Sequence, residues 1–362
     1  MRILYDGGAS QEHGAGGIKR YFANLISGLP EDFEPHLTTC RTAEELEPSH
    51  PRLRVHRFRR FRPQRLSLKL EKAYFGRVEA AYDFDIAHPT YYTLLSQREV
   101  GQYRCPVVIT VWDMIHELFP ELYPNSEFVA RKRRAIEAAD AILCISENTK
   151  QDLLSRYPVD EAKVLVTYLA ANLAATPVTS AQPTPSRPYF LYVGARTGYK
   201  NFHGLLSAFA VAATIATETI LCVVGPRFSD DEDQLIDEFG LSGKVENYGA
   251  VSDSQLATLY QRSLALVYPS LYEGFGIPPL EAMQCGTLVI AANRSSIPEV
   301  VGDAGLLFDP DERDDLTDIL VHVARHPEAR QPFIERGHSR LRKFTWDKTV
   351  RDTVEVYRSL AP

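Results

Sequence analysis

The sequence is poor in cysteine, and its few cysteines are scattered. Five occur in 362 residues, and no two of them form a Cys-x-x-Cys pair. They are Cys40, Cys105, Cys144, Cys222 and Cys285. Several lie in or beside apolar segments, where a reduced cysteine behaves as a small hydrophobic residue. The odd number and the spacing therefore favour reduced core cysteines over a disulfide framework.

The sequence also lacks an excess of positive charge and any apolar run long enough to span a bilayer. Its net charge of −7 argues against general nucleic-acid binding. The pattern of residues 1–6 predicts a β-strand at the very start of the sequence. We therefore expect that the protein has no signal peptide and is cytoplasmic. The hydrophobic fraction of 44% is ordinary for a globular chain, and the length of 362 residues suggests two domains.

Apolar strand-like segments alternate with amphipathic helical segments, which predicts an α/β fold. The first predicted domain spans residues 1–170. Residues 171–188 are rich in proline and small residues and form the predicted linker. The second domain spans residues 189–345, and residues 346–362 form a terminal helix.

The strongest functional pattern lies in residues 263–310. An apolar strand leads into a turn that begins at Glu273, and Pro278 and Pro279 then open a helix, because proline suits the first helical positions. Free N–H groups and the positive end of the helix dipole make such a start an anion site. The expected phosphate-binding residues are Gly274, Phe275, Gly276 and Ile277.

A carboxylate stands on each side of this anion site. A carboxylate beside a phosphate is better explained as an acceptor for hydroxyl groups than as a partner for charge. Glu273 would accept from a sugar hydroxyl, and Glu281, about two helical turns on, from a ribose diol. The implied ligand is a nucleoside diphosphate sugar. A solvated surface acid would be the better explanation for either glutamate alone, but not for the whole pattern from Glu273 to Glu281.

Two cations follow the first strand of the second domain. Arg196 and Lys200 lie in the loop before the helix that begins at Phe202. Their charges would neutralise a diphosphate, which removes the need for a metal ion, and we expect no cofactor.

The spacing of Glu273 and Glu281, with seven residues between them, resembles the signature of retaining glycosyltransferases of family 4. The segments 295–300 and 302–305 are also similar to that family. The resemblance implies the GT-B fold, in which two Rossmann-like doubly wound domains face each other across a cleft and the terminal helix crosses back to the first domain. It implies that the first domain binds the acceptor and the second binds the nucleotide sugar. It also implies hexosyl transfer with retention of configuration and without a metal.

The resemblance assigns further site residues in the first domain. Gly16 and Gly17, with Arg20, match the glycine pair that lies beside the donor phosphates and the acceptor in the family. His116 follows a buried strand and matches a histidine near the transferred sugar, although a lone histidine is more often structural. We therefore expect His116, Arg196 and Lys200 to act with Glu273 in catalysis.

The sequences of residues 113–120 and 295–300 resemble those of mannosyltransferases of O-antigen and capsule assembly. That favours transfer of mannose from GDP-mannose to a hydroxyl of a glycan or lipid-linked acceptor, in cell-surface polysaccharide synthesis. UDP- and dTDP-sugars stay open as donors. An epimerase of the same fold and a non-catalytic sugar-nucleotide-binding protein are alternatives of another class. A nicotinamide oxidoreductase would need a Gly-x-Gly-x-x-Gly turn, which the sequence lacks.

Arginine is clustered between Arg52 and Lys72, with Phe58 and Phe61 among the cations. One interpretation is a solvated face beside a helix. The other is peripheral contact with an anionic membrane surface or a lipid-diphosphate acceptor, because clustered arginine and interfacial aromatic rings suit both. Asp83 and Asp85 form the Asp-x-Asp metal motif of a different glycosyltransferase fold, which we interpret as a coincidence.

Overall fold

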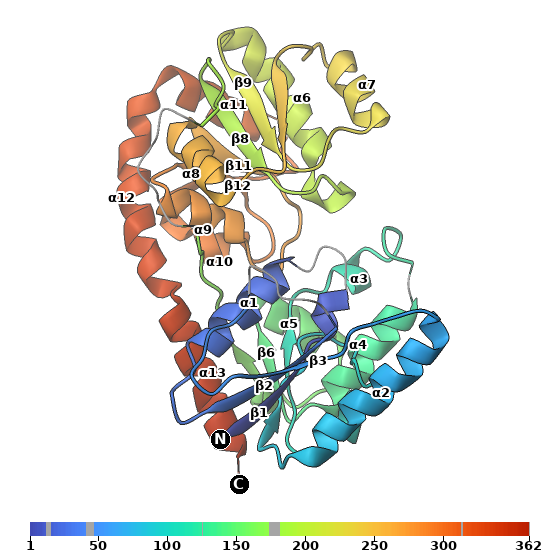
Figure 1. The fold of residues 1–362 in the computed structure, drawn as a ribbon. Helices are drawn as coiled ribbons and strands as arrows, with labels where there is room; N and C mark the ends of the chain where they lie inside the picture. The colour runs from blue at the N-terminus through green and yellow to red at the C-terminus, as the bar shows by residue number, and fades with distance from the viewer. Residues whose placement is uncertain (12–15, 41–46, 125, 174–181, 313, 362) are drawn as a thin grey trace. The chain divides into compact units, whose positions relative to one another are not determined.

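The computed structural model describes residues 1–11, 16–40, 47–124, 126–173, 182–312 and 314–361 (Figure 1). The chain divides into two compact units. The first contains Met1–Leu169 together with Trp346–Pro362, and the second contains Ala170–Thr345. Each unit is built on its own parallel β-sheet, and the two are described separately below.

The described residues of the first unit form seven short parallel strands. Four are paired in the order β3-β2-β1-β4 and three in the order β5-β6-β7. A parallel bridge between Ala87 and Val107 connects the two groups. The strands are β1 (Arg2–Asp6), β2 (Glu34–Thr39), β3 (Arg54–Arg57), β4 (Ile86–Ala87), β5 (Val108–Val111), β6 (Ala141–Cys144) and β7 (Val164–Val166). The central strands are apolar and buried along their whole length, as expected for a sheet covered on both faces.

Helices cover this sheet because each has one apolar stripe. In α1 the buried residues are Tyr21, Phe22, Leu25 and Ile26, which recur at the spacing of one helical face. The helices of the first unit are α1 (Gly16–Ser27), α2 (Gln64–Ala81), α3 (Ile115–Leu118), α4 (Ser126–Ala138), α5 (Glu147–Arg156) and α13 (Trp346–Leu360). The Ser146 side chain caps α5 by accepting a hydrogen bond from the Thr149 N–H.

The terminal helix α13 contributes to the core of the first unit through Tyr357, which is fully buried. Its hydroxyl lies 2.5 Å from Nδ1 of His88 and 3.2 Å from the hydroxyl of Tyr5. Nε2 of His88 is 2.9 Å from the Thr110 hydroxyl. Burial lowers the pKa of His88 to about 3, so the ring is neutral at pH 7. This polar network connects the last helix to β1, β5 and the segment after β4.

In the part of the second unit that the structure describes, six strands form a parallel sheet in the order β10-β9-β8-β11-β12-β13. Its strands are β8 (Tyr189–Val193), β9 (Ile220–Val224), β10 (Val245–Gly249), β11 (Ala265–Tyr268), β12 (Val289–Ala292) and β13 (Gly305–Phe308). Its helices are α6 (Phe202–Ile215), α7 (Asp230–Glu238), α8 (Asp253–Arg262), α9 (Ile277–Gln284), α10 (Ile297–Val301), α11 (Asp315–Arg325) and α12 (Gln331–Arg340). The strand order reverses between β8 and β11, and the carboxyl ends of strands at such a point form ligand sites.

None of the helices in the described ranges combines the length and the apolar content that a membrane crossing needs. The Asp-x-Asp pair has a structural use. Asp85 accepts a hydrogen bond of 2.6 Å from the Arg2 N–H, at the start of the central strand.

Substitution of Tyr357 by Phe should lower the unfolding free energy by about 1–3 kcal/mol, because it leaves Nδ1 of His88 and the buried hydroxyl of Tyr5 without the partner that the Tyr357 hydroxyl provides. Urea unfolding followed by circular dichroism measures the change. Tyr74→Phe, at a half-buried ring on α2, is the matched control. Equal unfolding midpoints for the two variants would show that the network does not stabilise the first unit.

Candidate active site

The turn after β11 is held in place by two serines from the loop after β12. The Glu273 N–H donates to Oγ of Ser295 at 2.8 Å. The buried Ser296 hydroxyl lies 2.9 Å from the Glu273 carbonyl oxygen and 2.8 Å from that of Phe275. Gly276 has a φ of 121°, a conformation that side chains rarely adopt, and it leads directly into α9. The backbone that would bind a phosphate is therefore fixed by neighbouring groups.

Glu273 and Lys200 form a close ion pair across the second unit. Lys200 ends a short 3₁₀ turn, Gly198–Lys200, that follows β8. Its Nζ lies 2.7 Å and 2.8 Å from the two carboxylate oxygens of Glu273. The side chains are only 19% and 9% exposed, so each charge depends on the other for compensation.

Arg196 is held more firmly than the sequence suggested. Its Nε and Nη2 donate to the two carboxylate oxygens of Glu232 at 2.6 Å and 3.0 Å. The guanidinium carbon lies 4.9 Å from the ring centre of Phe228 and 5.6 Å from that of Phe202. Nη1 is buried and has no hydrogen-bond partner among the described residues. That nitrogen can donate to a ligand while the rest of the guanidinium stays fixed.

Glu281 lies in α9 and is 8% exposed, so it is not the exposed helix residue of the simpler interpretation. Its Oε2 accepts a hydrogen bond of 3.2 Å from the hydroxyl of Tyr260. Burial raises the pKa of Tyr260, which keeps that hydroxyl protonated and able to donate.

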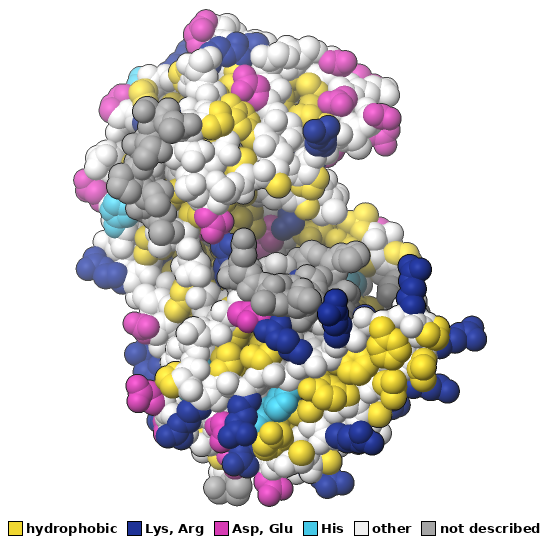
Figure 2. All heavy atoms as spheres, viewed as in Figure 1, with side chains coloured by type: hydrophobic (Ala, Val, Ile, Leu, Met, Phe, Trp, Pro, Cys, Tyr) yellow, Lys and Arg dark blue, Asp and Glu magenta, His cyan; other side chains and the backbone are white. Residues whose placement is uncertain are grey.

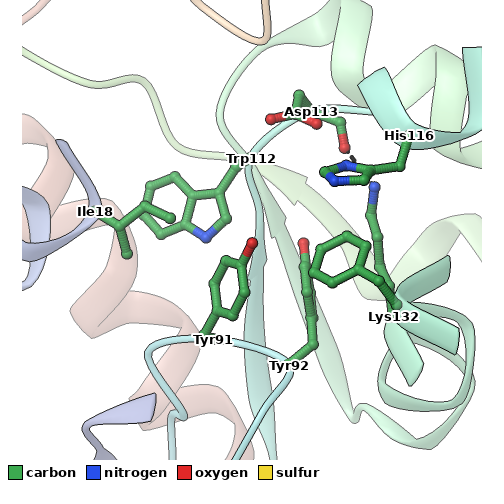
Figure 3. Close-up of a pocket in the computed structure, with 8 residues that line it drawn as sticks. Ile18, Tyr91, Tyr92, Trp112, Asp113, His116 and Lys132 are labelled. Carbon is green, nitrogen blue, oxygen red and sulfur yellow. Dashed lines mark hydrogen bonds between the residues drawn. The ribbon is translucent and has the colours of Figure 1, made fainter. Parts of the chain in front are cut away.

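His116 lies in the first unit and lines a small pocket, with a cavity volume of about 40 Å³ (Figure 3). It belongs to the short helix α3, which follows β5. Its ring centre lies 4.2 Å from that of Phe128 and 4.7 Å from that of Tyr123. Burial lowers the pKa of His116, so the neutral ring is the dominant form at pH 7.

Lys132 of α4 lines the same pocket and was not identified from the sequence, where it is one of four successive cations. It is 1% exposed. Its Nζ donates to the Asp113 carbonyl oxygen at 2.6 Å and to Oε2 of Glu117 at 3.0 Å. The Tyr157 hydroxyl donates to the other oxygen of Glu117 at 2.8 Å. Lys132 thus fixes the segment that carries His116.

The glycine pair lies at the start of α1. A Cβ atom placed on Gly16 or Gly17 would meet no atom within 4 Å, so no described residue crowds them. Arg20 lies one turn further along the same helix. The preceding Gly14 and Ala15 of the glycine-rich loop lie outside the described residues.

The predicted site residues therefore fall into two groups. Arg196, Lys200, Glu273, Glu281 and residues 274–277 lie in the second unit, and Gly16, Gly17, Arg20 and His116 lie in the first. Direct contact is seen between Lys200 and Glu273. The acidic run 230–233 begins α7, and its Glu232 also binds Arg196. No sequence pattern marked that pairing.

Comparison with known proteins identifies the family. The model described as glycosyl transferases group 1 matches residues 180–340, and that described as glycosyltransferase family 4 matches residues 15–174. The O-antigen chain mannosyltransferase B of Escherichia coli is 31% identical over 272 residues, which cover 70% of this chain and 70% of that protein. The chain belongs to glycosyltransferase family 4.

Solved structures establish the fold of this glycosyltransferase. The superposition on sucrose-phosphate synthase from Thermosynechococcus elongatus has a TM-score of 0.77 at 21% sequence identity. It covers 99% of this chain and 98% of the synthase chain. The superposition on Anabaena HepE in complex with UDP-glucose has a TM-score of 0.74 at 17% sequence identity. It covers 99% of this chain and 100% of the HepE chain. The predicted GT-B fold, with two Rossmann-like α/β domains, is confirmed.

A double-mutant cycle on Lys200→Met and Glu273→Gln should give a coupling of about 1–3 kcal/mol in the unfolding free energy, because either single change leaves a poorly solvated charge without its partner. Pairing Lys200→Met with Glu79→Gln, whose carboxylate lies in the first unit, gives the uncoupled control. A Lys200–Glu273 coupling no larger than the control value would contradict the assigned ion pair.

Proposed function

We propose that this glycosyltransferase moves a hexosyl group from a nucleoside diphosphate sugar to an acceptor hydroxyl, with retention of anomeric configuration and without a metal. The bond from the anomeric carbon to the phosphate oxygen breaks. The acceptor oxygen bonds to the same carbon on the same face, and its proton passes to the leaving phosphate. The observation that carries the proposal is the Lys200–Glu273 pair beside the amino end of α9.

Negative charge develops on the leaving diphosphate, and fixed cations stabilise it without reorganisation. Two of the three ammonium donors of Lys200 can serve Glu273, which leaves the third for a phosphate oxygen. Nη1 of Arg196 supplies a second donor, and the N–H groups of residues 275–277 supply others. These groups take the place of a metal ion in the proposed mechanism.

Glu273 and His116 orient the transferred sugar in this proposal, and Glu281 accepts from the ribose hydroxyls. Gly16 and Gly17, with Arg20, lie beside the diphosphate and the acceptor. A neutral His116 can both donate and accept a hydrogen bond, which suits a sugar hydroxyl.

We propose GDP-mannose as the donor and a glycan or lipid-linked glycan of a surface polysaccharide as the acceptor. The support is the mannosyltransferase relative at 31% identity. The HepE structure contains UDP-glucose, so a UDP-sugar is the alternative donor. An epimerase or a non-catalytic binding protein would also bind the nucleotide, but neither would yield a glycosylated acceptor.

Thermal unfolding with GDP, UDP, dTDP and their sugars, in the presence of EDTA, tests the donor. The matching nucleotide should raise the Tm by about 5–10 °C at roughly a hundredfold excess over Kd.

Lys200→Ala and Glu273→Ala should each abolish transfer without changing the fold. Lys343→Ala, at an exposed residue of the second unit, should leave transfer unchanged. Normal turnover in either site variant, or no Tm shift with any nucleotide, would overturn the proposal.

We also propose that α2 docks on an anionic membrane surface, where a lipid-linked acceptor would lie. Leu66 and Leu70 share one face of the helix and are 49% and 45% exposed, and Phe61 before it is 44% exposed. Arg62 and Arg65 flank them. Figure 2 shows hydrophobic side chains beside Lys and Arg side chains in this region. Exposed apolar residues among cations are typical of an interfacial helix.

Vesicle co-sedimentation tests this contact. Binding should be stronger to vesicles that contain phosphatidylglycerol than to pure phosphatidylcholine, and salt should weaken it. Replacing both Leu66 and Leu70 by Ser should reduce it about tenfold or more. Leu165→Ser, at a leucine of β7 that is 39% exposed, is the control. Equal binding of wild type and the double variant would leave α2 as a solvated face.

A further inference from the structure

Three residues other than glycine have a positive φ in the described part of the chain, and two of them adjoin the Lys200–Glu273 pair. Asn201, with a φ of 53°, directly follows Lys200. Ser295 has a φ of 48°, and its Oγ accepts from the Glu273 N–H at 2.8 Å. The third is Gln97, in the first unit. Backbone strain of this kind persists only where surrounding contacts impose it, and it is concentrated at functional sites.

The two positions in the second unit differ in what their side chains bring to this conformation. Asparagine adopts a positive φ more readily than most residues, so Asn201 fits its backbone. Serine lacks that preference, and a glycine would adopt the same backbone without strain. A glycine at position 295 would, however, remove the side-chain oxygen that holds the Glu273 N–H. The hydroxyl is therefore what a strained serine supplies here and a relaxed glycine does not.

The neighbours of Ser295 fix the backbone on both sides of it. Before it, Nη2 of Arg294 donates to Oδ1 of Asp309 at 2.6 Å, which attaches this loop to the segment after β13. After it, the buried Ser296 side chain is hydrogen-bonded to carbonyl oxygens of the turn after β11. The Ile297 N–H donates to the Arg294 carbonyl oxygen at 3.1 Å, which closes a tight turn around the two serines. Ser295 therefore cannot relax without breaking one of these contacts.

Glu273 is fixed at both ends by groups from different strands of the sheet. Its N–H is held by Ser295, which follows β12, and its carboxylate by Lys200, which follows β8. A side chain held at its backbone origin and at its charged end has little freedom to turn. Ser296 instead holds the carbonyl oxygens of Glu273 and Phe275, on the side that leads to α9. The two serines thus act on different parts of the turn.

We propose that Ser295 is a positioning residue, and that its hydroxyl fixes the Glu273 peptide so that the Glu273 carboxylate meets the transferred sugar. The inference rests on the proposed function, in which Glu273 orients that sugar. The strained backbone lowers stability at position 295, and the fixed carboxylate is what the strain provides. Stability and activity should therefore respond differently when this residue is changed.

Ser295→Gly and Ser295→Ala separate the hydrogen bond from the strain, because both remove the hydroxyl but only glycine relaxes the backbone. The Tm of the glycine variant should exceed that of the alanine variant by about 2–4 °C. Both should lower kcat/KM for the nucleotide sugar by the same factor, about 3- to 10-fold, the value of one hydrogen bond. The Kd of the nucleoside diphosphate that stabilises the wild type should not change, since that ligand has no sugar for Glu273 to orient.

A residue with a merely structural role would make activity follow the Tm. A larger kinetic defect in Ser295→Ala than in Ser295→Gly would therefore overturn the proposal, as would an equal loss of affinity for the nucleoside diphosphate. Ser242→Ala is the matched control, because Ser242 is an exposed serine of the second unit that also loses a side-chain hydrogen bond, to Asp237. Its kcat/KM should be that of the wild type.

Hydrogen exchange of the protein without substrate tests the contact independently of catalysis. The Glu273 amide should exchange about 3- to 10-fold faster in both Ser295 variants than in the wild type, and at the wild-type rate in Ser242→Ala. An unchanged rate in the Ser295 variants would overturn the proposal whatever the kinetics show. If the wild type turns over no nucleotide sugar, the proposed function fails, while the exchange rate still decides whether Ser295 fixes the turn.

Discussion

Parallel pairing of the strands directs the carboxyl ends of the strands in each sheet to a single edge, and the positions of the candidate site residues depend on this constraint. In the second unit, Lys200 follows β8, Glu273 follows β11 and Ser296 follows β12. In the first unit, His116 follows β5. Residues far apart in the sequence meet there without long excursions of the chain. A site of this kind tolerates change in its loops, because the sheet fixes where each loop begins.

Each of three cations in or near the candidate site residues is compensated by a glutamate. Lys200 is paired with Glu273, Arg196 with Glu232, and Lys132 with Glu117. Each pair is at least partly withdrawn from water, where an unpaired charge would be costly. Because the partners are already in place, the cations are oriented before a ligand arrives. A preorganised site of this kind spends little free energy on rearrangement when charge develops.

Local patterns in the sequence predicted much of this arrangement. The strand–turn–helix around Glu273 is local, because Pro278 and Pro279 and the preceding glycine mark a helix start within a few residues. The two-domain α/β fold followed from alternating periodicities. Glu232 and Lys132 could not be singled out, because their roles depend on contacts between distant segments. In the sequence they belong to an acidic run and a basic run, each typical of an ordinary surface.

The position of α13 has a consequence for the order in which the protein can be made. Tyr357 completes the buried network of His88 and Tyr5, although the whole second unit lies between them in the chain. Domains usually fold as units, in the order in which they leave the ribosome. Here the first unit receives α13 only after the second unit has been synthesised. The unit that is translated first therefore depends, for part of its core, on a helix that is translated after the second unit.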